Sequence, residues 1–285
     1  MVAPEHVTSA GVYHGEGPCW WDGWGGLRYV DMLAGDVLSL DADTGTATRT
    51  HVGEVAAVIR PRVVGGAVLA LRDSFAVTDD SLDELRTIAQ LTQPDGVRLN
   101  EGGCDPDGRF YCGSMADDET PHAGVFYQVK PTGEVTIVLE KVTISNGFDF
   151  SPDNSRAYYI DTVEHVIDVF DYSAAEGLRN RRRWVEIPEE AGGPDGLVVD
   201  AEGGVWVALF GGAAVHRYSV DGELDARIEL PVSSVTACTF GGRDLQTLYI
   251  TTSQIRADLD AEPTAGGLFA IDPGVRGLPA RAFAG

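Results

Sequence analysis

The sequence has few basic residues and few cysteines. Its 285 residues contain 21 Lys and Arg against 44 Asp and Glu, which gives a formal net charge of −23. Nucleic acids and anionic membranes are bound by clusters of Lys and Arg, so this balance argues against both partners. The cysteines are too scattered for a disulfide scaffold or a zinc ribbon; they are Cys19, Cys104, Cys112 and Cys238. We expect four thiols in a reducing cytoplasm.

Long apolar runs are also missing. No segment approaches the roughly 18 consecutive apolar residues that a membrane-spanning helix needs. Residues 1–16 lack the basic start and the apolar stretch of a secretory signal. The histidines form no HExxH motif, so a histidine-based zinc site is not expected. These absences predict a cytoplasmic protein, and we expect it to be a monomer or a weak homo-oligomer.

Glycine, by contrast, is abundant, with 35 residues where average composition gives roughly 20. A short segment rich in aromatic and β-branched residues recurs every 40 to 49 residues, each time after a turn signal such as Asp22-Gly23. Its six copies are LRYVD (27–31), AVLAL (67–71), YCGSM (111–115), AYYID (157–161), WVALF (206–210) and TLYIT (247–251). Each copy is typical of a β-strand, and a short run before each turn predicts its hairpin partner.

Two further strands are predicted in each repeat. The third strand recurs as DVLSLD (36–41), SFAVTD (74–79), GVFYQV (124–129), VIDVFD (166–171), AVHRYS (214–219) and GLFAID (267–272). A more polar strand then follows, as in GEVTIVLE (133–140). Four strands per unit of roughly 40–50 residues are the signature of a propeller blade. We predict an all-β fold: a six-bladed β-propeller with four-stranded antiparallel blades, one domain over 1–285, with a helical turn at most near 174–179.

The ring of a propeller has to close, and the two ends of the chain are the candidates for closing it. We expect residues 5–12 to pair with the last blade, whose other strands come from the C-terminal part of the chain. The ending ARAFAG (280–285) is the alternative source of that outer strand, and the sequence leaves the choice open. The tight turns of six blades explain the glycine excess, because turn positions with positive φ favour glycine.

One column of the repeat is polar where packing would favour apolar residues. The residues 11 positions before each second strand are Glu16, Ala56, Asn100, Asn146, Asp195 and Thr236. A single Asp or Asn there would usually cap a turn. Equivalent positions of a propeller lie on one ring around its axis, however, so the two carboxylates and two amides would converge. Such oxygen ligands favour Ca²⁺, Mg²⁺ or Mn²⁺, with Zn²⁺ also possible, and the column predicts one divalent metal ion.

Five motifs in order resemble the senescence-marker protein (regucalcin)/gluconolactonase family. They are HGEGPCW (14–20), RLNEGGCDPDGRFYCGSM (98–115), ISNGFDFSPDNSRAYYIDT (144–162), PDGLVVDAEGGVWVA (194–208) and TACTFGGRDLQTLYIT (236–251). The resemblance runs from about residue 8 to the end of the chain. It implies a six-bladed β-propeller with a central divalent metal and an activity on sugar lactones.

The resemblance also implies roles for particular residues. Glu16, Asn146 and Asp195 correspond to the family's metal ligands, and Asp195 would also assist the attacking water. Arg98 and Asn100 would contact the substrate. An acidic substrate contact of the family falls on Asp118, with Glu119 as the alternative. His14, two residues before Glu16, is interpreted as a loop histidine, with a place at the mouth of the site as the alternative.

The expected function is therefore metal-dependent hydrolysis of a gluconolactone-type or aldonolactone-type sugar lactone to the aldonic acid. Two alternatives stay open. Calcium propellers that hydrolyse organophosphates or aryl esters place a similar set of Glu, Asn, Asn and Asp on their axis. A calcium-binding propeller without turnover would use the same column, but it would have no need for Arg98 and Asn100 beside it.

Overall fold

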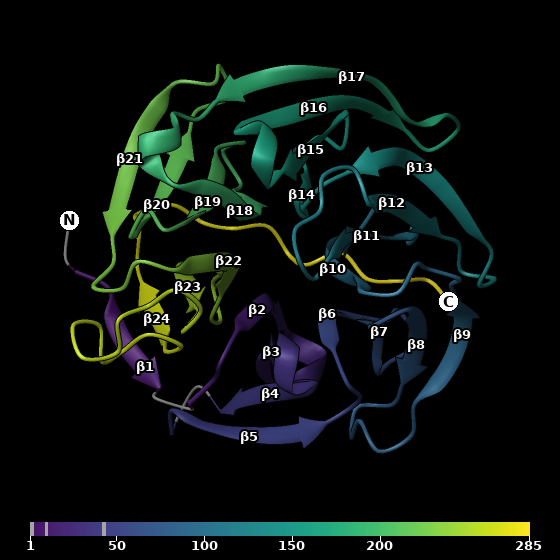
Figure 1. Cartoon of the computed structure of the whole chain (residues 1–285), viewed down its shortest axis with the longest axis horizontal. Coiled ribbons are helices and arrows are strands. Elements are labelled where there is room, and N and C mark those ends of the chain that lie inside the picture. The colour runs from purple at the N-terminus through teal and green to yellow at the C-terminus, as the bar shows by residue number, and fades with distance from the viewer. Residues whose placement is uncertain (1–2, 9–10, 42–43) are drawn as a thin grey trace.

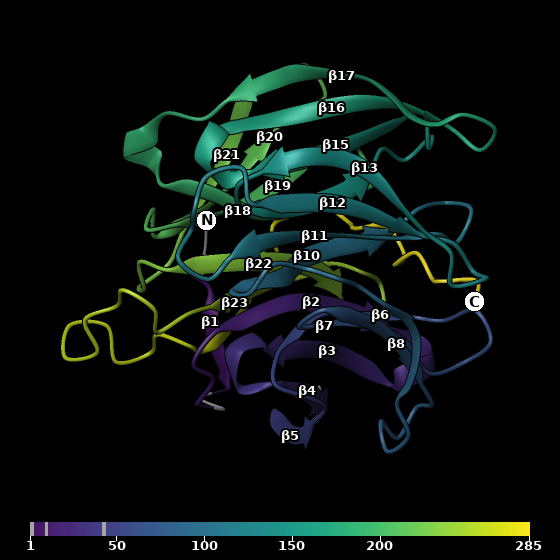
Figure 2. The same cartoon turned by 45° about the vertical axis from the view of Figure 1, so that its right-hand side comes forward.

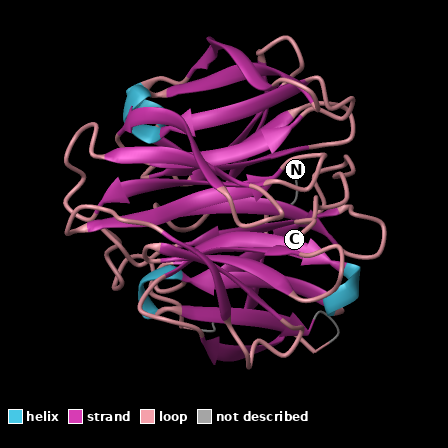
Figure 3. Cartoon of the chain, turned by 90° about the vertical axis from the view of Figure 1, so that its right-hand side faces the viewer, coloured by secondary structure: helices cyan, strands magenta, loops and turns pink. Residues whose placement is uncertain are grey.

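The fold is a closed ring of six four-stranded antiparallel sheets (Figure 1). The computed structural model describes residues 3–8, 11–41 and 44–285. Viewed from its edge, the ring is built almost entirely of strands, with loops gathered at both faces (Figure 3). The predicted six-bladed β-propeller is therefore confirmed. No helix among the described residues is long and apolar enough to cross a membrane.

We number the blades along the chain, and each begins with its inner strand. Blade 1 comprises β2 (Gly15–Trp21), β3 (Gly26–Asp31), β4 (Asp36–Asp41) and β5 (Thr46–His51). Blade 2 comprises β6 (Ala56–Pro61), β7 (Ala67–Leu71), β8 (Ser74–Thr78) and β9 (Arg86–Gln90). Blade 3 comprises β10 (Val97–Cys104), β11 (Phe110–Ala116), β12 (Gly124–Val129) and β13 (Val135–Val142).

The second half of the chain repeats this plan. Blade 4 comprises β14 (Ser145–Phe150), β15 (Arg156–Asp161), β16 (Val166–Ser173) and β17 (Gly177–Glu186). Blade 5 comprises β18 (Gly193–Val199), β19 (Val205–Phe210), β20 (Ala214–Tyr218) and β21 (Leu224–Glu229). Blade 6 comprises β22 (Val235–Gly241), β23 (Thr247–Thr252), β24 (Leu268–Ile271) and β1 (Glu5–Thr8).

The helical content of the described residues is limited to short 3₁₀ turns. These are η1 (Asp22–Trp24), η2 (Met32–Ala34), η3 (Thr162–Glu164) and η4 (Glu189–Ala191). The helical turn that the sequence allowed at most near 174–179 is not formed, because residues 174–176 form a plain turn and β17 begins at Gly177. That turn joins β16 to β17, whose antiparallel pairing continues up to it, with Ser173 opposite Gly177.

The N-terminal strand closes the ring. β1 pairs antiparallel with β24, with Glu5 opposite Ala270 and His6 opposite Phe269. It is the outermost strand of blade 6, so one sheet joins the first and the last strand of the chain. This answers the question of the outer strand in favour of the N-terminal segment; residues 9–10 of the expected 5–12 strand lie outside the described residues.

The C-terminal tail has a different place in the fold. After β24 the chain crosses the middle of the ring, where it is the yellow trace of Figure 1. Its backbone bonds to blade 6 and to three other blades: Gly277 N to Leu245 O (2.8 Å) in blade 6, Ala201 N to Arg276 O (2.8 Å) in blade 5, Phe283 N to Pro61 O (2.8 Å) in blade 2 and Ala284 N to Gly108 O (2.9 Å) in blade 3. We call residues 276–285 the strap.

The apolar core lies between neighbouring blades, and the strap contributes to it. Phe283 is fully buried in a cluster of residues from blades 1 to 3. Its ring lies 6.5 Å from that of Phe110, edge to face. The strap is therefore anchored by a side chain in the core as well as by backbone bonds.

Phe283→Ala is expected to lower the free energy of unfolding by about 3–5 kcal/mol, because it removes a fully buried aromatic side chain. Urea unfolding followed by circular dichroism measures the change. The matched control is Val220→Ala, a side chain that is half exposed on blade 5, for which a change within about 0.5 kcal/mol is expected. Equal stability of the Phe283 variant and the wild type would show that the strap is not anchored there.

Candidate metal and substrate site

A β-bulge or similar irregularity interrupts each inner strand at or beside the polar column. The pairing register shifts between Glu16 and Cys19, Ala56 and Val58, Leu99 and Gly102, Ser145 and Phe148, Pro194 and Leu197, and Val235 and Ala237. A bulge redirects side chains and ends regular pairing. Because the irregularity recurs in all six inner strands, the polar side chains of the column turn away from their sheets at the same height along the axis.

Four of the six column residues line one cavity of about 330 Å³. They are Glu16, Asn100, Asn146 and Asp195, all at least 95% buried. Arg98 and His14 line the same cavity. Thr236 has a structural role, because its hydroxyl donates to the Gly15 carbonyl at 2.5 Å and ties blade 6 to blade 1.

The two amides are oriented by a chain of hydrogen bonds across blades 3, 4 and 5. Arg98 Nη1 donates to Asn100 Oδ1 at 2.5 Å, and Asn100 Nδ2 donates to the Ser145 carbonyl at 2.9 Å. Asn146 Nδ2 then donates to Thr162 Oγ1 at 2.8 Å, and that hydroxyl donates to the Pro194 carbonyl at 2.8 Å. With its amide nitrogen engaged by Thr162, Asn146 keeps its oxygen on the other side, at 3.3 Å from Asn100 Nδ2.

The two carboxylates of the column have too few hydrogen-bond donors and cations around them to balance their negative charges. Asp195 Oδ1 is buried and has no hydrogen-bond partner, and Glu16 Oε2 accepts from the Gly17 backbone N–H at 3.1 Å. Burial raises the pKa of Glu16 well above its usual range, and the charges of Asp195 and Glu101 raise it further. Burial and the Glu101 charge likewise raise the pKa of Asp195. A buried carboxylate needs a cation or a proton.

These residues fit a hard divalent cation. The unpartnered Asp195 oxygen, the Glu16 carboxylate and the Asn146 amide oxygen are the kind of donors that such an ion prefers. Within the described part of the chain, no group of three His, Cys, Asp or Glu side chains is arranged to hold a metal ion. The expected ligand set differs from such a group, because it has only two acids, Glu16 and Asp195, and its third member is the Asn146 amide.

His14 lines the cavity, which is the alternative that the sequence left open beside a loop position. Its Nδ1 is 2.9 Å from Ser253 Oγ, and its Nε2 is 3.9 Å from Glu16 Oε1. Burial and the charge of Arg98 lower its pKa to about 3, so the imidazole is neutral near pH 7. The signal was present in the sequence: residues two apart on a strand share a face, and His14 precedes Glu16 by two.

Arg98 is buried beneath the mouth of the cavity. Its Nε lies 3.3 Å from Asp117 Oδ1, and Nη1 also reaches the Leu99 carbonyl at 3.2 Å. Burial lowers its pKa below the usual value for arginine, while the Asp117 and Glu16 carboxylates act in the opposite direction. This arginine and the two acids place opposite charges close together in a site of low dielectric constant.

The structure does not bring Asp118 to the cavity. Its carboxylate is exposed and caps its own loop, accepting from the Thr120 backbone N–H at 3.0 Å and from its hydroxyl at 2.7 Å. The neighbouring Glu119 lines the cavity instead and pairs with Arg256 at 2.8 Å. The reason is local: a loop has no fixed side-chain alternation, so spacing alone does not decide which of two adjacent acids faces inward.

The Glu119–Arg256 pair joins loops of two blades that face each other across the ring. Glu119 lies between β11 and β12 of blade 3, and Arg256 lies between β23 and β24 of blade 6. The β23–β24 loop stands out from the ring at the left of Figure 2. The pair therefore narrows the mouth of the cavity.

Fold and cavity together define a class: a six-bladed β-propeller with a buried, oxygen-lined site on its axis. The sequence profile described as SMP-30/Gluconolactonase/LRE-like region matches residues 14–254. The regucalcin of Danio rerio is 34% identical over 281 residues, which cover 95% of each protein. The chain belongs to the SMP-30/gluconolactonase/LRE-like family.

Two solved structures are similar over nearly the whole chain. A calcium-binding protein, regucalcin, from Agrobacterium tumefaciens matches with a TM-score of 0.93 at 27% identity, covering 99% of this chain and 97% of that one. A luciferin-regenerating enzyme matches with a TM-score of 0.91 at 27% identity, covering 99% and 100%. The structural similarity therefore covers all six blades and is not limited to those that carry the site.

Glu16→Gln is expected to stabilise the metal-free protein near pH 7. The pKa of Glu16 is raised on folding. Above pH 4, which is about the usual pKa of a glutamate side chain, the folded protein therefore binds more protons than the unfolded one. Stability contributed by this group is complete at lower pH and is lost as pH rises through the folded-state pKa. The variant should therefore show a smaller loss of stability between acidic and neutral pH.

The measurement is chemical unfolding across a pH series in the presence of a chelator. Comparison with the wild type removes the opposite contribution of His14, whose lowered pKa destabilises the protein as pH falls below about 6.5. Glu140→Gln, an exposed acid on β13, is the control and should follow the wild type. Parallel pH profiles for wild type and Glu16→Gln would contradict the assigned pKa shift.

Proposed function

We propose that this protein hydrolyses a sugar lactone of the gluconolactone or aldonolactone type to the aldonic acid. Membership of the family supports sugar lactone hydrolysis in general. The proposal that this site carries out the hydrolysis with a metal ion rests on one observation: Asp195 Oδ1 is buried and unpartnered beside Glu16 and the oriented Asn146 amide. A cavity of about 330 Å³ with a few polar groups at its base fits a ligand of this size.

Glu16, Asn146 and Asp195 would hold one divalent metal ion. Their oxygen atoms favour Ca²⁺, Mg²⁺ or Mn²⁺ and also allow Zn²⁺. The description of the Agrobacterium tumefaciens relative as a calcium-binding protein supports Ca²⁺. When bound, such an ion would polarise the lactone carbonyl and stabilise the negative charge that develops on its oxygen.

Asp195 is the proposed general base. Its carboxylate would accept a proton from water as the water oxygen attacks the carbonyl carbon. The ester bond to the ring oxygen then breaks, and the same carboxyl group returns the proton to the leaving ring oxygen. The product is an open-chain acid with one new hydroxyl group, so atoms and charges balance.

Arg98 and Asn100 would position the sugar. The Arg98 guanidinium and the Asn100 amide already bond to each other, so both are held in place before substrate binds. Their polar atoms suit sugar hydroxyls, and the guanidinium also suits the carboxylate of the product. At the mouth, we propose that Glu119 makes the acidic contact first assigned to Asp118, because Glu119 lines the cavity.

The compartment and assembly state are proposals as well. We propose a cytoplasmic protein that acts as a monomer or a weak homo-oligomer. All four cysteines are free and buried, which suits a reducing compartment.

Asp195→Asn is expected to lower kcat for aldonolactone hydrolysis by about 10²–10⁴, because it removes the group that accepts the proton. A pH-indicator assay with added divalent ions measures hydrolysis, and circular dichroism checks the β-rich fold. Glu140→Gln is the control and should keep wild-type activity. Full activity of the Asp195 variant, or of chelator-treated wild type, would contradict the mechanism.

The same assay separates the alternatives. Faster turnover of a phosphotriester or aryl ester than of any aldonolactone would favour the organophosphate type of propeller. Tight binding of metal without turnover of either substrate would favour a non-catalytic calcium-binding protein.

Glu119→Gln is expected to raise KM by about 10- to 100-fold, because a charged hydrogen bond contributes roughly 1.5–3 kcal/mol. Asp118→Asn should leave KM unchanged, since its carboxylate faces solvent and bonds to Thr120. Steady-state kinetics on the two variants test the assignment. The opposite ranking would return the substrate contact to Asp118.

A further inference from the structure

Beneath the polar column lies a second layer of charged groups that the proposed mechanism does not use. Glu101 follows Asn100 within the bulge of β10, and Arg60 is on β6 of the neighbouring blade. Their side chains are 5% and 15% exposed. Arg60 Nη2 lies 2.9 Å from Glu101 Oε1, which also accepts from the Gly102 backbone N–H at 2.9 Å.

Arg60 also reaches the first blade. Its Nη1 donates to the Gly17 carbonyl at 3.0 Å and to its own strand at the Ile59 carbonyl at 2.8 Å. Gly17 directly follows Glu16 and has a φ of +52°, a conformation that side chains disfavour. The Arg60 guanidinium thus bonds to blades 1, 2 and 3, just below the layer formed by the two acids and the two asparagines of the column.

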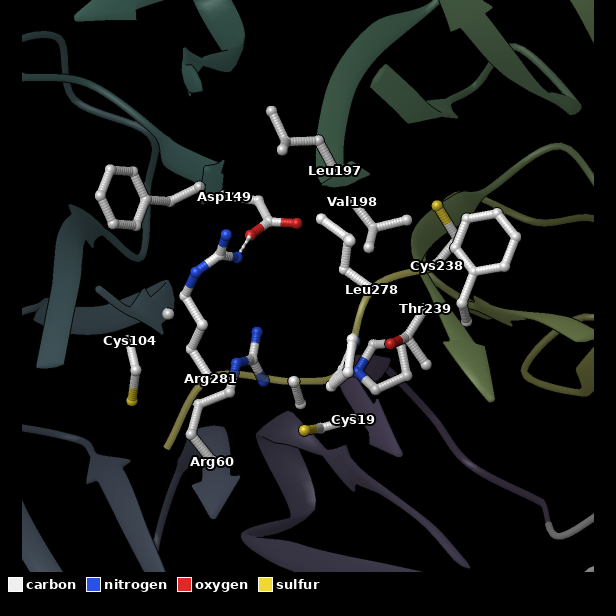
Figure 4. A pocket seen from close by; sticks show the side chains of 16 residues that line it. Cys19, Arg60, Cys104, Asp149, Leu197, Val198, Cys238, Thr239, Leu278 and Arg281 are labelled. Carbon is white, nitrogen blue, oxygen red and sulfur yellow. Dashed lines mark hydrogen bonds and ion pairs between the residues drawn. The ribbon is translucent and has the colours of Figure 1, made fainter. Parts of the chain in front are cut away.

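Among the described residues, no neighbouring side chain is bonded to Glu101 in a way that could replace the charge of Arg60. It borders a cavity of only about 70 Å³, which the strap crosses at Leu278–Arg281. Arg60 and Arg281 both point into this space, and Arg281 pairs with Asp149 at 2.8 Å (Figure 4). Glu101 Oε2 is already buried without a partner, so loss of Arg60 would leave both oxygens of that carboxylate without a cation.

We propose that Arg60 is a positioning residue for the axial site: it fixes the Gly17 carbonyl and balances the Glu101 carboxylate, and so holds Glu16 in place for a divalent ion and Asn100 in place for the substrate. This inference rests on the proposed function for the identity of the metal site. Arg60 touches neither substrate nor metal. Its effect is transmitted through the two backbone segments that carry Glu16 and Asn100.

The test is calorimetric titration of Ca²⁺, and separately of Mn²⁺, into chelator-stripped full-length protein. Arg60→Met is expected to weaken binding at least tenfold, in the range found for groups that support metal ligands. Arg60→Lys keeps the charge and bonds to fewer of the three partners, so a smaller loss of affinity is expected. Arg62→Met is the matched control, because Arg62 bonds to the Gly285 carbonyl of the strap at 2.6 Å.

A double variant separates positioning from charge balance. Arg60→Met with Glu101→Gln removes the unpaired charge but leaves the Gly17 carbonyl unheld. Recovered thermal stability with affinity still weakened supports positioning, while full recovery of affinity would reduce Arg60 to a charge partner and overturn the proposal. Where Arg60→Met does not fold, the Arg60→Lys titration decides.

The failures are distinguishable. Wild-type affinity in Arg60→Lys and Arg60→Met overturns this inference and leaves the proposed function intact. Absence of divalent-ion binding by the wild type overturns the metal site itself, and with it the role of Arg60.

Discussion

The crowding of negative charge on the axis of a closed ring is the constraint on which the rest of the site depends. The ring brings Glu16, Asp195 and Glu101 together where burial raises the pKa of each carboxyl group. Such a group is tolerated only with cations nearby. Arg98 lies on the cavity side and Arg60 below, and neither bonds to Asp195 Oδ1, which is buried without a hydrogen-bond partner.

The two ends of the chain maintain this arrangement in different ways. β1 completes the sheet of blade 6 and prevents the ring from opening, while the strap crosses the channel end opposite the mouth that Glu119 and Arg256 narrow. The buried Phe283 anchors the strap. The charged residues near the axis are buried, so their interactions are stronger than they would be in bulk water.

Much of this was predictable because a repeat converts sequence spacing into position in space. The six second strands and the six third strands fall where the pattern placed them, to within one or two residues. The column of Glu16, Asn100, Asn146 and Asp195 converges on one cavity for the same reason. The prediction failed for Asp118, since a loop between strands has no period. For His14 the sequence favoured a loop but left the mouth of the site open, and the structure places it in the cavity, 2.9 Å from Ser253.

The sequence by itself determined the six-bladed fold and the ring of oxygen-bearing residues, because strand alternation and turn chemistry act over a few residues and recur six times. Only the tertiary structure decided which end closes the ring, where the strap lies, which acid lines the mouth, and that Arg60 joins three blades. Those features depend on contacts between segments distant in the chain, such as Arg60 with Gly17 and Glu101, and no local pattern encodes them.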